Sequence, residues 1–174
     1  PDAPNFKVIV EKTFNQSIRR ICSIKKPVIA AVNGVAAGAG ANLALACDLT
    51  IAKESASFIQ AFSKIGLIPD SGGTWLLPRL VGMQRAKAMA FFGNKVGACE
   101  AESIGLIYKC AIDDEFDEFV KSTAEKLAAM PTLALGLTKA AFHEGMDCDL
   151  NEQLARELDY QFTASESEDY AEGV

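Results

Sequence analysis

The stretch "KPVIAAVNGVAAGAGANLALACDLTIA", residues 26–52, joins two short apolar runs through a segment of small residues. The runs 28–32 and 49–52 have the length and continuous hydrophobicity of buried strands. Apart from its first residue, the segment 33–40 holds no side chain larger than valine, which predicts a tight turn into a short buried helix over 41–47. This order of strand, turn, helix and strand predicts an α/β fold.

Outward from this stretch, hydrophobic periodicity predicts further elements on both sides. Strands and helices alternate in the first two thirds of the chain, and only helices follow. We therefore expect an α/β portion over residues 1–130 and a helical portion over 131–174. The other predicted elements are a helix over 11–24, a strand over 57–59, helices over 74–81 and 83–92 separated by Gly82, a helix over 98–105, a strand over 106–112, and helices over 114–129, 132–144 and 149–164.

The composition excludes several functional classes. The 174 residues carry a net charge of −6 and show no basic patch with interleaved aromatic residues, so we expect no nucleic-acid partner. There is no apolar run of about 18 residues, so we expect no membrane span. The five cysteines form no CxxC pair and their number is odd, which favours a reduced, cytoplasmic compartment. With His143 as the only histidine and no cysteine cluster, we expect no metal site.

The sequence lacks two common motifs because a single residue in each differs from the pattern. The segment "GAGANL", 38–43, has Leu43 where a dinucleotide-binding fingerprint needs its third glycine. The nucleophile motif GxSxG fails at Ser71, because position 69 is a proline. A Ser-His-Asp triad would depend on His143 alone, and we expect that residue on a helix surface.

The segment "IPDSGGTW", residues 68–75, places Asp70 between a proline and two glycines in apolar surroundings. An aspartate in front of a helix is ordinarily an N-cap, but Asp70 is also a candidate acid/base. The turn at 33–40 has two interpretations as well. It permits close helix–strand packing, or it lets a ligand approach the backbone at a helix N-terminus that favours negative charge. From the residues alone, both pairs of alternatives stay open.

Three segments together resemble the crotonase superfamily of enoyl-CoA hydratases and isomerases. They are residues 26–52, "FIQAFSKIGLIPDSGGTWLLPRLVG" at 58–82, and the pattern A-x-x-x-GLI at 101–107. The resemblance implies a spiral of β-β-α turns, followed by a helical C-terminal region that builds homotrimers, often paired into hexamers. It implies acyl-CoA thioester substrates and no separate cofactor, since coenzyme A is part of the substrate.

The resemblance also assigns site residues. One of the two backbone N–H groups that hold the thioester carbonyl in an oxyanion hole corresponds to Ala39, in the middle of the G-x-G triplet. The other belongs to an upstream segment that this sequence does not contain, so the chain looks like a fragment lacking the N-terminal part. The expected substrate-binding residues surround the turn and the segment after the strand at 57–59: Ala37, Gly38, Gly40, Asn42, Ala61, Phe62 and Ile65.

The two glutamates of the family's hydratases align with Asn42 and Phe62, so both carboxylates are missing here. Asp70 aligns with the single catalytic carboxylate of the family's isomerases. The sequence around Asp70 looks most like that of the phenylacetate-degradation branch of the family, whose enzymes isomerise a ring-epoxide of phenylacetyl-CoA. An acyl-CoA isomerase is therefore expected, with a hydratase-type enzyme or a non-catalytic oligomeric binding protein as alternatives.

The last predicted long helix carries an apolar row at i, i+4 spacing, formed by Leu150, Leu154, Leu158 and Phe162. This row needs an apolar partner. The helix over 132–144, with Leu133, Leu137 and Phe142, is one candidate. The other is a neighbouring subunit, which the resemblance favours.

Overall fold

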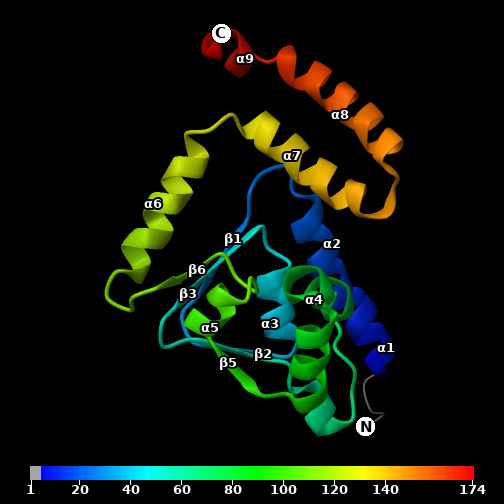
Figure 1. The fold of residues 1–174 in the computed structure, drawn as a ribbon, viewed down its shortest axis with the longest axis vertical. Helices are drawn as coiled ribbons and strands as arrows, with labels where there is room; N and C mark the ends of the chain where they lie inside the picture. The colour runs from blue at the N-terminus through cyan, green and yellow to red at the C-terminus, as the bar shows by residue number, and fades with distance from the viewer. Residues whose placement is uncertain (1–4) are drawn as a thin grey trace. The chain divides into compact units, whose positions relative to one another are not determined.

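The computed structural model describes residues 5–174 (Figure 1). The chain divides into two compact units. The first comprises residues 5–22 and 28–121 of the described range, and the second comprises 23–27 and 122–174. The sequence-based boundary at residue 130 stays a prediction.

Two small sheets form the centre of the first unit. In one, β1 (Ile29–Val32), β3 (Leu49–Lys53) and β6 (Lys109–Ala111) are parallel, in the order β1-β3-β6. In the other, β2 (Val35–Ala37) and β4 (Ser57–Ile59) are parallel, and β5 (Lys95–Gly97) is antiparallel to β4. The chain twice contributes one strand to each sheet before a helical connection. It forms β1-β2-α3 and then β3-β4-α4, which is the repeated β-β-α turn expected from the sequence.

The first unit also contains helices and helical turns. They are α1 (Phe6–Ile9), the π-helical turn η1 (Val10–Asn15), α2 (Gln16–Ser23, which ends in the second unit), α3 (Ala39–Leu45), the 3-10 turn η2 (Ala61–Ile65), α4 (Gly73–Phe92) and α5 (Ala98–Ser103). The first helical segment begins earlier than predicted, because the Asn5 side chain accepts a hydrogen bond from Val8 N–H and supplies an N-cap. Helix α4 bends at Gly82, whose φ of 76° and ψ of 160° are not helical, as the sequence predicted.

The strands β2 and β5 were not predicted. The sequence analysis places a turn over 33–40, but Val35–Ala37 pairs with Ser57–Ile59 in parallel register. Each of these strands has three residues, and Gly or Ala occupies half of their positions. Such strands form because β4 lies between them, and local periodicity does not show that pairing.

The core of the first unit lies between α3, α4, α5 and the sheets. Its most completely buried large side chains include Phe58, Leu77 and Leu106. A disulfide joins Cys99 on α5 to Cys110 on β6, which differs from the expectation of reduced cysteines. Spacing could not predict this pair, because the fold of α5 back onto β6 brings the two residues together.

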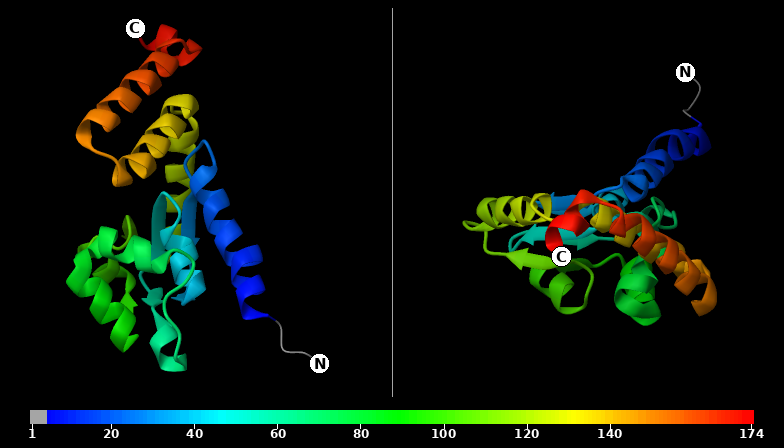
Figure 2. Two further views of the ribbon diagram at one scale, coloured as in Figure 1. Left: turned by 90° about the vertical axis from the view of Figure 1, so that its right-hand side faces the viewer. Right: turned by 90° about the horizontal axis from the view of Figure 1, so that it is seen from above.

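Helix α6 (Phe116–Ala128) passes from the first unit into the second, which also contains α7 (Thr132–Glu144), the 3-10 turn η3 (Gly145–Asp147), α8 (Leu150–Ser165) and α9 (Glu168–Gly173). Helices α7 (yellow) and α8 (orange) lie side by side (Figures 1 and 2). Asp149 and Glu152 form a capping box at the start of α8. Among residues 5–174, no helix is both long enough and apolar enough to cross a bilayer.

Candidate functional site

The turn between β2 and α3 is held against the end of β4. Because the two strands are parallel, Ala37 and Ile59 are paired at the same edge of their sheet. The Gly38 N–H then donates to the Ile59 carbonyl at 2.8 Å. Gly38 has φ 54° and ψ −124°, a conformation open only to glycine, and helix α3 begins at Ala39. The Ala39 N–H therefore has no acceptor within its own helix and is a preorganised donor.

Phe62 lies directly over this turn. A Cβ added to Gly38 would lie 3.6 Å from the Phe62 ring, and Phe62 itself is only 6% exposed. Its neighbour Ala61 begins η2, which ends at Ile65, and the Ile65 side chain is 72% exposed. The structure thus brings Phe62 to the turn between β2 and α3 and leaves Ile65 largely open to solvent.

Asn42 on α3 is completely buried and ties three segments together. Its Nδ2 donates to the Asp70 carbonyl at 2.8 Å, and its Oδ1 accepts from Gln60 Nε2 at 2.8 Å. A Cβ on Gly73 would overlap the Asn42 amide, so this glycine makes the close approach possible. The Asn42 side chain therefore faces inward and holds the main chain of Asp70 in place.

Asp70 is partly buried at the start of a tight turn, in which the Gly73 N–H donates to the Asp70 carbonyl at 2.8 Å. One carboxylate oxygen, Oδ1, accepts a hydrogen bond from Ser71 Oγ at 2.9 Å. The N-cap of α4 is Gly72, and no side chain caps this helix. The N-cap alternative for Asp70 is therefore wrong, and the carboxylate is not occupied by the helix end.

Gln60 and Ser71 were missed by the sequence analysis. Gln60 is completely buried, and Ser71 is 2% exposed. Within the described residues, Gln60 Oε1 has no protein partner, so the side chain is retained inside the core through a single hydrogen bond to Asn42. The available signal was a lone polar residue between the apolar pairs "FI", 58–59, and "AF", 61–62, since a buried amide needs a specific partner.

An apolar hollow of about 320 Å³ is lined by residues of α4 from both sides of its bend at Gly82. It begins at Ile68 and Pro69, the two residues directly before Asp70, although Asp70 itself does not line it. The remaining lining residues come from α4: Gly73, Thr74, Leu77, Pro78, Met83, Ala86, Lys87, Ala90 and Phe91.

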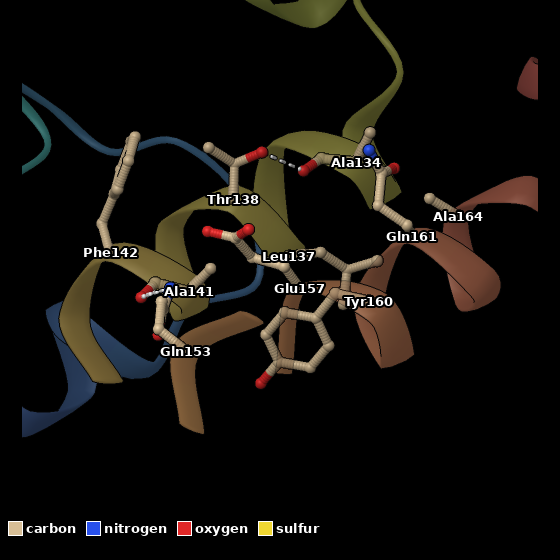
Figure 3. Close-up of a pocket in the computed structure, with 10 residues that line it drawn as sticks. All are labelled: Ala134, Leu137, Thr138, Ala141, Phe142, Gln153, Glu157, Tyr160, Gln161 and Ala164. Carbon is tan, nitrogen blue, oxygen red and sulfur yellow. Dashed lines mark hydrogen bonds between the residues drawn. The ribbon is translucent and has the colours of Figure 1, made fainter. Parts of the chain in front are cut away.

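A second hollow, of about 290 Å³, lies between α7 and α8 in the second unit (Figure 3). Figure 3 shows Gln153 donating to the Ala141 carbonyl across it, and Thr138 donating to the carbonyl of Ala134 on its own helix. Glu157 is the only carboxylate among its ten lining residues, and none of the predicted site residues lines it. Over residues 5–174, no group of three His, Cys, Asp or Glu side chains is arranged to hold a metal ion.

Similarity to known proteins extends along almost the whole chain. The sequence pattern of the enoyl-CoA hydratase/isomerase family matches residues 2–174. The chain is 48% identical over 172 residues to the 1,2-epoxyphenylacetyl-CoA isomerase of Escherichia coli (strain K12), covering 99% of this chain and 66% of that protein. It is also 48% identical over 170 residues to a probable enoyl-CoA hydratase of Rhodobacter capsulatus, covering 98% of this chain and 66% of that protein.

The fold agrees with solved structures. The crystal structure of an enoyl-CoA hydratase from Polaromonas sp. JS666 matches with a TM-score of 0.92 and 34% identity, over 99% of this chain and 67% of that one. This confirms the expected spiral of β-β-α turns. The chain spans just under two thirds, 66%, of the length of the two curated relatives.

Proposed function

Because the chain belongs to the enoyl-CoA hydratase/isomerase family, we propose that the protein isomerises an acyl-CoA thioester, with Asp70 as its single acid/base. The observation that carries this proposal is that neither of the two positions where a hydratase needs a glutamate holds a carboxylate. One is Asn42, whose amide is used inside the protein, and the other is Phe62, an apolar wall. Asp70 is the carboxylate that remains.

A 1,3-proton shift needs one carboxylate and a place for negative charge. Asp70 takes the proton from the carbon next to the thioester, and the electron pair moves to the thioester oxygen. The Ala39 N–H at the start of α3 stabilises that oxygen, and each such donor contributes a factor of roughly 10²–10³. Asp70 then returns the proton at a more distant carbon, which restores the carboxylate.

For the acyl group, we propose an aromatic one such as a ring-epoxide of phenylacetyl-CoA. The 48% identity to a 1,2-epoxyphenylacetyl-CoA isomerase supports this choice. The apolar hollow at the bend of α4 and the buried Phe62 ring would suit an apolar acyl group. The roles proposed for Ala37, Gly38, Gly40, Ala61 and Ile65 are contacts with the thioester, and Asn42 acts through the main chain of Asp70.

Hydration is the second candidate, because a relative named as a probable enoyl-CoA hydratase is equally similar, at 48% identity. A non-catalytic binding protein is the third. The hydrogen-bonded turn at Gly38 and the separately held Asp70 support an enzyme over a binding protein.

We further propose a homotrimer, or a hexamer made of two trimers, in the cytoplasm, with no cofactor besides the coenzyme A of the substrate. The exposed apolar row on α8 supports an assembly: Leu150 is 71% exposed, Leu154 51%, Leu158 71% and Phe162 64%. Helix α7 therefore does not cover this row. The Cys99–Cys110 disulfide is unusual for a reducing compartment, and thiol counting of protein extracted under alkylating conditions tests that placement.

The deciding experiment supplies purified full-length protein with a 3-enoyl-CoA, with crotonyl-CoA, and with the ring-epoxide of phenylacetyl-CoA. We expect double-bond migration in the first, little or no hydration of the second, and ring-expanded product from the third. Efficient formation of 3-hydroxyacyl-CoA from crotonyl-CoA would make the protein a hydratase. No turnover of any substrate would leave the binding protein as the remaining function.

A further inference from the structure

Ser71, directly after Asp70, has an unusual backbone. Its φ is 51°, and among residues 5–174 it is the only residue other than glycine with a positive φ. The next residue, Gly72, has φ 79°, so both central residues of the Asp70–Gly73 turn are left-handed. A residue with a Cβ is strained in this conformation, whereas glycine adopts it freely.

The side chain at this position has a specific contact. Ser71 is 2% exposed, and its Oγ donates to Asp70 Oδ1 at 2.9 Å. A glycine would satisfy the backbone without strain, so the turn alone does not explain a serine here. The hydroxyl is the feature that glycine cannot supply, and it is aimed at the candidate acid/base.

The two ends of Asp70 are thereby held from different directions. Asn42 Nδ2 holds the carbonyl, and Ser71 Oγ holds one carboxylate oxygen. Within the described part of the chain, the other oxygen, Oδ2, accepts no hydrogen bond. A carboxylate fixed through one oxygen presents the second in a defined direction, which is the geometry that proton transfer requires.

We propose that Ser71 is a positioning residue that fixes the Asp70 carboxylate through Oδ1 and leaves Oδ2 as the oxygen that moves the proton. This rests on the proposed role of Asp70 in isomerisation. In the first half of the reaction the substrate C–H bond breaks, the Oδ2–H bond forms, and the electron pair passes to the thioester oxygen. In the second half the electron pair returns from the thioester oxygen and restores the carbonyl, the new C–H bond forms at the more distant carbon and the Oδ2–H bond breaks, so no further reactant is needed.

The test compares Ser71→Gly, Ser71→Ala and Asp70→Asn in the full-length protein, with the 3-enoyl-CoA as substrate. Both serine variants lose the hydroxyl, but only Ser71→Gly also removes the backbone strain. We expect kcat to fall by about 10²-fold in each, the effect typical of a misplaced reacting group, with KM unchanged. We expect the melting temperature of Ser71→Gly to equal or exceed that of the unchanged protein, and that of Ser71→Ala to be lower.

Ser103→Ala is the matched control, because Ser103 Oγ donates to the Glu100 carbonyl at 2.8 Å at the end of α5, and the variant loses one serine hydrogen bond away from Asp70. It should keep kcat. A purely structural role for Ser71 predicts that Ser71→Gly keeps kcat too, and that result overturns the proposal. A fall in kcat accompanied by a raised KM and a lower melting temperature in Ser71→Gly also overturns it. If Asp70→Asn is inactive and Ser71→Gly is normal, only the positioning role fails, whereas an active Asp70→Asn removes the proposed function itself.

Discussion

In the first unit, polar side chains lie inside the protein, whereas in the second unit a row of apolar side chains lies outside. Asn42 and Gln60 are fully buried and hydrogen-bonded to each other, and Asn42 also holds the Asp70 carbonyl. On α8, Leu150 and Leu158 are each 71% exposed. Buried polar groups destabilise a fold unless they are paired, and an exposed apolar row remains unfavourable until another surface covers it. The Asn42 amide is thus paired within one chain, although Gln60 Oε1 has no partner among the described residues, whereas the apolar row on α8 is left exposed.

The largest expected effect concerns the centre of the first region. Asp70→Asn keeps the shape of the side chain but removes the base, so isomerisation by the full-length protein should fall by at least the roughly 10²–10⁴ attributed to acid–base catalysis. Acyl-CoA binding should stay nearly intact. Turnover of a 3-enoyl-CoA, together with binding of a non-isomerisable saturated acyl-CoA by calorimetry, measures both. Near-normal turnover would remove Asp70 from the mechanism.

The second prediction concerns the exposed apolar row on α8. Replacing Leu154 and Leu158 by Asp should dissociate the assembly, because covering each leucine contributes about 1.5–3 kcal/mol and every 1.4 kcal/mol is tenfold in affinity. Light scattering at micromolar concentration should show trimers or hexamers for the unchanged protein and smaller species for the double variant.

Thr163→Asp is the control for added charge on the same helix, since Thr163 is exposed but does not belong to the row. It should leave the assembly intact. If the unchanged full-length protein is a monomer, no neighbouring subunit covers the apolar row on α8, and the prediction is wrong.

The third prediction compares one chemical change in both regions. Gln60→Leu leaves the buried Asn42 Oδ1 without its donor, and an unsatisfied buried group costs about 1–3 kcal/mol. Gln161 on α8 is exposed, although it is one of the residues that line the α7–α8 hollow, and Gln161→Leu should change stability by no more than about 0.5 kcal/mol. Urea unfolding midpoints of the two variants measure the difference. Equal midpoints would show that the buried amide pair contributes nothing beyond its shape.

Much of the fold follows from local sequence. The apolar runs that became β1, β3 and β4 were predicted as strands because buried strands are continuously hydrophobic, although β1 is only half-buried and its Ala31 is exposed. The break in α4 was predicted because Gly82 interrupts a helical pattern. The strands β2 and β5 could not be predicted in this way, because pairing with β4 rather than their own residues makes them strands.

The candidate site also has a part that local sequence predicts and a part that depends on contacts between distant residues. Ala39 and Asp70 were predicted as site residues because they lie in contiguous motifs that resemble a family, and their roles stay predictions. The contacts that hold Asp70 join residues far apart in sequence: Asn42 and Asp70 are 28 positions apart, and Gln60 and Asn42 are 18 positions apart. No pattern in a single sequence reports such a separation. Ser71 is adjacent to Asp70, yet its left-handed backbone and its hydroxyl contact appear only in three dimensions.

The smallest expected effect involves an ion pair at the margin of the first unit. Lys109 Nζ donates to Glu102 Oε1 at 2.7 Å, and the Cys110 N–H donates to Oε2 at 2.8 Å. The Lys109 hydrogen bond, followed by that of Cys110, lowers the pKa of Glu102 below its usual 4.5. A carboxylate with a lowered folded-state pKa contributes stability above pH 4.5, and that stability is lost as the pH falls through the folded-state value.

Glu102→Gln should therefore destabilise the protein at pH 7 by at most about 1 kcal/mol, since the pair is partly exposed. The difference from the unchanged protein should shrink as the pH falls below 4.5, because both then carry an uncharged group. Glu100→Gln, an exposed change on the same helix, is the control and should follow the unchanged protein. Urea midpoints at pH 7 and at successively lower pH values measure this. A Glu102→Gln difference that stays constant down to strongly acidic pH would mean that shape rather than charge at this position stabilises the junction of α5 and β6.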